Sequence, residues 1–326
     1  MERQFGLDFI RVTEFAALAA ARTMGKGDEE LSDRVSTDTI RAELNKLPIR
    51  GRVVIGEGDD ASKSRLFVGE EVGDWEKIRN AWEVDIAVDP LENNKAVAFG
   101  GSSAAVVLAV SERGGILNAP DVYMDKIIVG PTAVGKVDIN ATPTANVQAI
   151  AKAFGRDPDD ILIAILDRER NQPLINEVKT AGARIQLIRD GDLTLGIAAA
   201  IRGTGMHAVM GIGGAPEGVL AAAALRCLGG EIQAKFMALN PEHEKRLRQW
   251  GITDLTRVYK TKDLVSGEQI VFAATAVTRG DLLKGVRFFS GGARTESLFM
   301  GYQNRKIRFI DTVHVFEPDV MPVLVR

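Results

Sequence analysis

The sequence predicts an α/β protein whose two halves contain different kinds of sheet. In the first half, two helical segments precede short β-branched runs separated by turns, which is typical of an α+β arrangement with a mainly antiparallel sheet. In the second half, strands alternate with helices, which is typical of βαβ units and a parallel sheet. The length of 326 residues fits about two domains of roughly 150 residues each.

Composition and charge narrow the class of function. Hydrophobic residues make up 45 % of the chain and charged residues 26 %, as in ordinary globular proteins. The formal net charge is −3 and there is no basic run, which argues against a nucleic-acid partner. No apolar run approaches the roughly 18–20 residues of a membrane span, and the first residues lack the layout of a signal peptide. We therefore expect a cytoplasmic protein that binds neither nucleic acid nor membrane.

The cysteine and histidine content restricts the metal chemistry. Cys227 is the only cysteine, so the chain cannot form an internal disulfide or a thiolate zinc site. The three histidines are far apart in sequence, which argues against a histidine-based metal site. Any divalent metal ion must therefore bind mainly to carboxylates. Cys227 falls in an apolar helical stretch, where we expect a buried, inert thiol.

Two helices are predicted before the first strand. Apolar residues between Leu7 and Ala21 fall on one helical face, and Glu14 lies in the same stripe, where a carboxylate needs a partner or solvent. The second helix ends at Pro48. Asp33 lies seven residues before the apolar Ile40 of this helix, so its side chain should project toward the interior.

The remaining elements follow from changes in hydrophobic period. In the first half we expect strands at 52–55, 84–88 and 104–110, with a hairpin partner beginning at Ile116. In the second half, strands at 161–166, 183–188 and 207–210 alternate with helices. Strands are expected again at 270–273, 286–289 and 307–315.

Acidic residues follow several of these strands. Ligands of open α/β sheets bind outside the carboxyl ends of strands, and Mg²⁺ or Mn²⁺ prefers oxygen ligands there. Such a metal site can clamp a phosphoryl group. The alternative is that these residues are ordinary turn and helix-cap residues. They are Glu57, Asp89, Glu92, Asp190, Asp192 and Glu217.

Three further features are each open to a functional and a structural interpretation. The loop Gly211–Gly218 fits a phosphate cradle or a simple turn before a helix. Arg168 and Arg170 suit phosphate binding, or a turn neutralised by the interleaved acids. Tyr123 and Lys126 fit substrate contacts, while Tyr123 also fits simple packing.

As an ordered set, the motifs resemble the class II fructose-1,6-bisphosphatases. The resemblance extends from Arg11 to His314, and the segment around Gly285–Phe289 is most similar to the branch that also handles sedoheptulose-1,7-bisphosphate. It implies the layered α/β/α/β/α fold of the metal-dependent, lithium-sensitive sugar phosphatases. The motifs are Gly56-Glu57-Gly58, Val84–Pro90, Asn118–Met124, Asp190-Gly191-Asp192 and Gly211–Gly218.

The resemblance implies hydrolysis of the 1-phosphate of fructose-1,6-bisphosphate, and of sedoheptulose-1,7-bisphosphate in one branch, in gluconeogenesis or sugar-phosphate cycling. The reaction would be an in-line attack by water bound to Mg²⁺ or Mn²⁺. The resemblance also suggests a homo-oligomer, either dimer or tetramer. We expect a metal-binding α+β domain at 1–140 and an α/β substrate domain at 141–326, with strands after about residue 265 able to pack back on the first sheet.

The implied site residues fall into three groups. The metal ligands are Asp33, Glu57, Asp89, Glu92 and Glu217. The substrate contacts are Glu92, Asn93, Asn94, Tyr123, Arg168, Glu169, Arg170, Asp190, Gly191, Asp192 and Gly214. The catalytic residues are Asp59 and Asn94.

Several positions depart from the family's pattern and support two alternatives. After its Asp-Pro-Leu-Glu motif the family has Gly and then Thr or Ser, where this chain has Asn93 and Asn94. A hydroxyl can relay a proton and an amide cannot, and a second acid of the family is replaced by Ala61. One alternative is a catalytically impaired homologue that binds metal and sugar phosphate in a regulatory or oligomeric role. The other is a phosphatase with a changed substrate, because Lys63, Arg65 and Glu169 alter the charge around the pocket.

Overall fold

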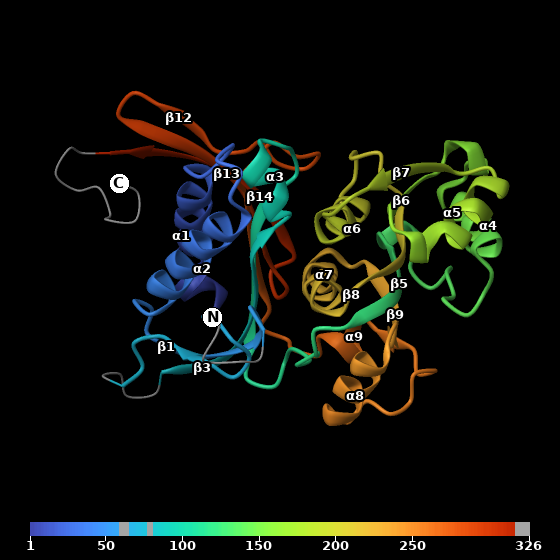
Figure 1. The fold of residues 1–326 in the computed structure, drawn as a ribbon, viewed down its shortest axis with the longest axis horizontal. Coiled ribbons are helices and arrows are strands. Elements are labelled where there is room, and N and C mark those ends of the chain that lie inside the picture. The colour runs from blue at the N-terminus through green and yellow to red at the C-terminus, as the bar shows by residue number, and fades with distance from the viewer. Residues whose placement is uncertain (59–64, 77–80, 317–326) are drawn as a thin grey trace. The chain divides into compact units, whose positions relative to one another are not determined.

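The computed structural model describes residues 1–58, 65–76 and 81–316, which form two compact units (Figure 1). Unit 1 contains residues 1–116 together with the segment that begins at Gly267, and unit 2 is Leu117–Ser266. The first division falls near residue 117 instead of the expected 140. The reason is that residues 123–129 form a strand in the middle of the second sheet.

Unit 1 is built on a mixed sheet with eight strands among the described residues. Their order is β12-β13-β11-β4-β3-β1-β2, and β14 pairs with β13. The strands are β1 (Ile49–Ile55), β2 (Glu71–Val72), β3 (Trp82–Glu92), β4 (Ala105–Glu112), β11 (Val271–Ala276), β12 (Arg287–Phe289), β13 (Gly292–Gly301) and β14 (Lys306–Val315). The helices are α1 (Glu2–Ala21), α2 (Glu29–Leu44) and α3 (Asn94–Phe99).

The pairing in this sheet is antiparallel except between β1 and β3, so the predicted mainly antiparallel sheet is confirmed. β11 lies between β4 and β13 and is hydrogen-bonded to both, so strands after residue 265 do complete the first sheet. The predicted hairpin at Ile116 is wrong. The chain leaves the sheet there, and the amide of Leu117 donates to the carbonyl of Leu264 at 2.8 Å.

Helices α1 and α2 cover one face of this sheet, α1 against β4, β11 and β13 and α2 against α1 and β3 (Figure 1). The buried stripe of α1 is centred on Phe5 and Phe9, whereas Leu7 is 80 % exposed. Glu14 has the partner that its position demands, because its Oε1 accepts a hydrogen bond from the Thr312 hydroxyl at 2.6 Å. Within the part of the chain that the structure covers, no helix is long and apolar enough to cross a membrane.

Unit 2 is built on a second mixed sheet, with the strand order β10-β9-β5-β8-β6-β7. The strands are β5 (Tyr123–Val129), β6 (Leu162–Leu166), β7 (Arg184–Ile188), β8 (Ala208–Gly214), β9 (Glu231–Met237) and β10 (Tyr259–Lys260). The helices are α4 (Pro143–Phe154), α5 (Gln172–Thr180), α6 (Asp192–Ala200), α7 (Ala215–Leu228), α8 (Pro241–Gln249) and α9 (Thr261–Leu264), with short 3₁₀ turns η1 (Pro131–Ala133), η2 (Pro158–Asp160) and η3 (Glu169–Asn171).

The predicted parallel sheet in this half requires correction. β6 is parallel to β7 and β8, but β5 is antiparallel to both β8 and β9. The β8-α7-β9 segment is a βαβ unit whose two strands run in the same direction, although no strand was predicted at 231–237. They are not neighbours, because β5 is inserted between them. The alternation of strands and helices along the sequence predicts the direction of each strand, but it does not predict which strands are neighbours in the sheet.

Unit 2 is a three-layered α/β/α arrangement, with α4 and α5 on one face of the sheet and α6 and α7 on the other (Figure 1). Successive side chains of β5 point toward opposite faces of the sheet. Ile127 and Val129 belong to the core under α4 and α5. Ile128 lies against Gly196 of α6, and Met124 lies against Gly218 of α7. Lys126 shares this second face, because side chains on a strand alternate.

Candidate active site

Unit 2 contains a cavity of about 450 Å³ at one end of its sheet. It lies beyond the carboxyl ends of β6, β7 and β8 and beside the start of the antiparallel β5, which is where open α/β sheets bind ligands. Helix α8 adds one wall. The lining residues are Asp121, Val122, Tyr123, Leu166, Arg168, Arg170, Arg189, Asp190, Asp192, Gly214, Glu217, Glu242, His243 and Arg246.

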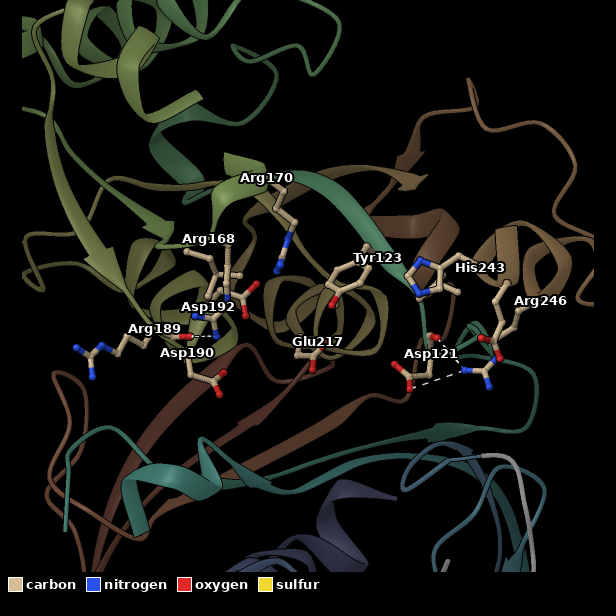
Figure 2. Close-up of a pocket in the computed structure, with 14 residues that line it drawn as sticks. Asp121, Tyr123, Arg168, Arg170, Arg189, Asp190, Asp192, Glu217, His243 and Arg246 are labelled. Atoms are coloured by element: carbon tan, nitrogen blue, oxygen red, sulfur yellow. Dashed lines mark hydrogen bonds and ion pairs between the residues drawn. The ribbon is translucent and has the colours of Figure 1, made fainter. Parts of the chain in front are cut away.

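Charged side chains occupy both ends of this cavity. Figure 2 shows Arg168, Arg189, Asp190 and Asp192 at one end, and Asp121, His243 and Arg246 at the other, with Tyr123, Arg170 and Glu217 between them. Four arginines thus line a cavity that also contains five carboxylates. This mixture suits a ligand with anionic groups and hydroxyls, since arginine binds phosphate and carboxylates accept hydrogen bonds from hydroxyls.

Tyr123 is held between two side chains in the middle of the cavity. The Arg170 guanidinium carbon lies 4.5 Å from the centroid of the Tyr123 ring, and the His243 ring lies 5.5 Å away at an angle of 51°. Arg170 Nε also donates to the carbonyl of Ile212 at 3.1 Å, which fixes the guanidinium plane. Both Tyr123 and Arg170 are therefore rigidly placed for a ligand.

Asn171, which follows Arg170, stabilises the turn after β6. Its side-chain amide donates to the carbonyls of Leu166 and Ile212, and its Oδ1 accepts from the amide of Ile212 at 2.8 Å. Asn171 thus uses both donor and acceptor atoms of one amide. Arg168 Nη2 donates to the carbonyl of Arg189 at 2.6 Å, which joins this turn to the end of β7.

Glu217 lies in the first turn of α7, and its Oε2 is buried without a hydrogen bond among the described residues. Burial raises the pKa of Glu217 to about 7, the Lys126 ammonium opposes this rise, and Asp192 adds to it. A buried carboxylate oxygen without a donor is suited to a cation. Glu217 therefore fits the metal-ligand role that the resemblance implies.

Two glycines of the segment 211–218, which the structure assigns to the end of β8 and the start of α7, have steric explanations. A Cβ at Gly213 would lie 2.5 Å from Asp192 Oδ2 and 2.9 Å from Lys126 Cε. Gly211 has a φ of +113°, which favours glycine. The predicted loop after residue 210 requires correction, because β8 continues to Gly214 and α7 begins at Ala215 without a turn between them. The glycines let this strand end pack closely on the charged side chains beside it.

The other four metal-ligand candidates lie in unit 1. The predicted strand ending at Val88 continues to Glu92, with an irregular register between Asp89 and Glu92, so Pro90 sits in a bulge instead of ending the strand. Glu92 is buried. On α2, burial raises the pKa of Asp33. Glu57 follows the end of β1, as expected.

Asn93 explains one of the departures from the family's pattern. Its φ of +64° lies in the left-handed region, which glycine adopts freely and asparagine tolerates better than most residues. Its amide donates to the carbonyl of Ser102 at 3.1 Å. Glycine and asparagine are therefore both suited to the backbone conformation of this chain at position 93. Asn94 begins α3.

Part of the predicted site falls outside the described residues, namely Asp59, Ala61 and Lys63. Arg65, at the end of that segment, forms an ion pair with Asp38 of α2. Among the described side chains, no group of three or more histidines, cysteines or carboxylates is arranged to hold a metal ion. The predicted ligand set therefore stays a prediction.

The cavity brings together six of the predicted substrate residues and one predicted metal ligand. Glu169 and Gly191 are not among its lining residues, and Glu92, Asn93 and Asn94 lie in unit 1. The prediction missed Arg189, Glu242, His243 and Arg246. The only sequence signal for α8 is a helix start at Asn240-Pro241, with His243 and Arg246 one turn apart. This pattern is common on protein surfaces. The seven predicted residues that do line the cavity are Tyr123, Arg168, Arg170, Asp190, Asp192, Gly214 and Glu217.

An α/β fold with an arginine- and carboxylate-lined cavity at its strand ends defines a protein that binds a polar, anionic small molecule. Residues 3–314 match the family described as bacterial fructose-1,6-bisphosphatase, glpX-encoded. The chain belongs to this family of phosphoric monoester hydrolases, and the predicted resemblance is confirmed.

Three relatives match this chain over nearly its whole length and carry related names. A D-fructose 1,6-bisphosphatase class 2/sedoheptulose 1,7-bisphosphatase of Synechococcus sp. (strain JA-3-3Ab) is 46 % identical over 97 % of this chain and 96 % of its own. The protein of the same name from Synechococcus elongatus is 45 % identical over 100 % of both chains. One from Acaryochloris marina is 44 % identical over 99 % of this chain and 98 % of its own.

Proposed function

We propose that this protein hydrolyses the 1-phosphate of fructose-1,6-bisphosphate, and also acts on sedoheptulose-1,7-bisphosphate. The observation that carries the proposal is the cavity of unit 2, where Tyr123, Arg168 and Arg170 line the same space as Asp190 and Asp192. Arginine suits the phosphate groups of such a substrate, and the carboxylates suit its hydroxyls. Family membership makes a sugar bisphosphate the preferred anionic ligand.

We propose Mg²⁺ or Mn²⁺ as the cofactor, with Asp33, Glu57, Asp89, Glu92 and Glu217 as ligands. Burial of the Glu217 oxygen without a hydrogen bond among the described residues, and the raised pKa of Asp33, support carboxylates that need a counter-ion. A bound divalent ion would supply charge stabilisation at the phosphoryl group and lower the pKa of a water molecule. The oxygen-only donor set suits these hard cations.

Within unit 2, the protein's own groups bind and orient the sugar. Arg170 keeps its guanidinium over the Tyr123 ring and bonded to the Ile212 carbonyl, so substrate phosphate would meet a fixed fork instead of a flexible chain. Arg168 is similarly fixed through its bond to the Arg189 carbonyl. Asp59 and Asn94 are proposed to act at the water that attacks phosphorus. We also propose a cytoplasmic homo-oligomer, a dimer or tetramer, acting in gluconeogenesis or sugar-phosphate cycling.

The test is phosphate release from fructose-1,6-bisphosphate with Mn²⁺, with Mg²⁺ and without metal. Sedoheptulose-1,7-bisphosphate is the second substrate, and inositol monophosphate is the negative control. Metal-dependent release from the two bisphosphates is the expected result. Metal-dependent binding of fructose-1,6-bisphosphate without release would instead identify an impaired homologue. In that case the double variant Asn93→Gly/Asn94→Thr should raise turnover.

A further inference from the structure

Lys126 carries a charge deep in unit 2 and is not among the residues that line the cavity. Its side chain is 2 % exposed and lies on the face of β5 that packs against α6 and α7. Its ammonium lies 2.7 Å from Asp192 Oδ2 and donates to the carbonyl of Gly214 at 2.9 Å. Both partners line the cavity, so Lys126 contacts the cavity wall from behind.

Stability alone does not explain a lysine at this position. Met124 and Ile128 occupy the same face of the strand and are fully buried apolar residues. A buried ion pair costs desolvation on both sides and is often no more stabilising than apolar packing of the same volume. An ammonium at this position, in place of an apolar group, indicates that it serves to orient Asp192 and Gly214.

The two partners come from different elements, which Lys126 joins. Asp192 is the first residue of α6, after Gly191 in the left-handed conformation, and Gly214 ends β8 and precedes α7. A side chain at Gly213 would collide with both Asp192 and Lys126, so the end of β8 packs directly on the pair. The ammonium therefore sets the positions of two helix starts relative to each other at the cavity.

We propose that Lys126 is a positioning residue, which fixes the Asp192 carboxylate and the Gly214 carbonyl in the orientations that the sugar bisphosphate meets. This inference rests on the proposed function for the identity of the ligand. Lys126 does not touch the ligand, and it acts through Asp192 and Gly214. The ammonium holds Oδ2 of Asp192, and Asp192 itself lines the cavity.

The decisive variant is Lys126→Met, which keeps the apolar part of the side chain as far as Cε and removes the charged ammonium. The matched control is Arg52→Met, which removes an ion pair to another fully buried carboxylate, Asp85, at 3.1 Å in unit 1. Both variants should lower the melting temperature. Only Lys126→Met should raise the KM for fructose-1,6-bisphosphate, by about 10-fold or more, with kcat within about threefold of the wild type, measured well below the melting temperature.

Lys126→Gln is the second variant, and it keeps a donor for the Gly214 carbonyl if Lys126→Met fails to fold. It should give an intermediate KM. A lower melting temperature with KM and kcat both within twofold of the wild type would overturn the proposal and leave Lys126 a structural residue.

Crystal structures of the wild type and the variant separate this proposal from the proposed function. A displaced Asp192 carboxylate and a displaced Gly214 carbonyl are expected whether or not the wild type hydrolyses sugar bisphosphates. Unchanged positions of both groups would overturn the positioning role. Failure of the wild type to bind or hydrolyse any sugar bisphosphate would overturn the proposed function alone.

Discussion

A Cβ atom at Gly214 would lie 1.8 Å from Oε2 of Glu217, so the carboxylate occupies the space that a side chain at Gly214 would need. The backbone at Gly214 has φ −62° and ψ 143°, which every residue adopts easily. The small size of Gly214 therefore matters because of its neighbour Glu217 and not because of its backbone conformation. The consequence is that the smallest possible substitution at Gly214 must move Glu217.

We expect Gly214→Ala to lower kcat/KM for fructose-1,6-bisphosphate by about 100-fold, because a shift of about 1 Å in a positioned group can cost that much. Steady-state kinetics at saturating Mn²⁺ measures the effect. Gly280→Ala is the control, since a Cβ there meets no atom nearer than 3.5 Å. Equal kinetics for the Gly214 and Gly280 variants would show that the position of Glu217 does not matter.

The left-handed backbone of Asn93 predicts how substitutions there change stability. Asn93→Ala should lower the free energy of unfolding by about 1–2 kcal/mol, because alanine pays the steric cost of this conformation and lacks the hydrogen bond to Ser102. Asn93→Gly should lose about 1 kcal/mol less than Asn93→Ala, because both variants lack the hydrogen bond to Ser102 and only glycine avoids the steric cost. Urea unfolding distinguishes the two. An alanine variant as stable as the wild type would contradict this explanation.

Arg170→Lys tests the planar fork, because the variant keeps the charge and loses the stacking on Tyr123 and the Nε–H donor to Ile212. We expect the KM for fructose-1,6-bisphosphate to rise about 10-fold, as for a loss of roughly 1.4 kcal/mol of binding. Arg184→Lys is the control, since Arg184 donates to the carbonyl of Asp160 and does not line the cavity. A KM unchanged in both variants would place the phosphate elsewhere.

His207 predicts a loss of stability in mild acid. Its Nδ1 accepts from the amide of Leu162 at 3.1 Å, and burial, aided by Arg156 and Arg184, lowers the pKa of its imidazole from the ordinary 6.5. The folded state therefore favours neutral imidazole. This contribution is fully present above the unfolded pKa and is lost as the pH falls below about 6.5, by at most about 1.4 kcal/mol per pH unit.

The measurement is the free energy of unfolding of the wild type and of His207→Asn between pH 7.5 and 5. Asparagine provides a similarly placed acceptor that does not titrate in this range. The wild type should lose more stability than the variant over this interval, although the variant loses the packing of the ring on Phe154 at all pH values. Parallel curves for the two proteins would exclude His207 as the titrating group.

The sequence predicted most strands, and the exceptions have physical reasons. β13 was missed over its whole length, because Arg294 and Glu296 interrupt its apolar pattern and Gly291-Gly292 reads as a turn. Hydrophobic period reports whether a strand is buried on one face or two, but this strand is stabilised by its pairing with β11 and β14. β5 and β9 were also missed as strands, and strand order is not encoded locally, so the position of β5 between β8 and β9 was not foreseen.

Only some of the residues that line the cavity were predicted, for similar reasons. Tyr123, Arg168 and Asp192 were identified through motifs at strand ends, and the fold brings them to one cavity. His243 and Arg246 lie on a surface helix whose composition resembles any solvated helix, so only the fold shows that they face the cavity. Lys126 was predicted as a possible substrate contact. Its burial beneath the cavity depends on packing by α6 and α7, which no local pattern encodes.

The most direct test of the central claim is phosphorus NMR of fructose-1,6-bisphosphate after incubation with the protein and Mn²⁺, recorded once the paramagnetic Mn²⁺ has been removed on a chelating resin. The method identifies which phosphate leaves as well as whether one leaves. We predict that inorganic phosphate and fructose 6-phosphate appear together in equal amounts, and that neither appears when the metal is chelated. Appearance of fructose 1-phosphate, or an unchanged spectrum with folded protein and added Mn²⁺, would contradict the account.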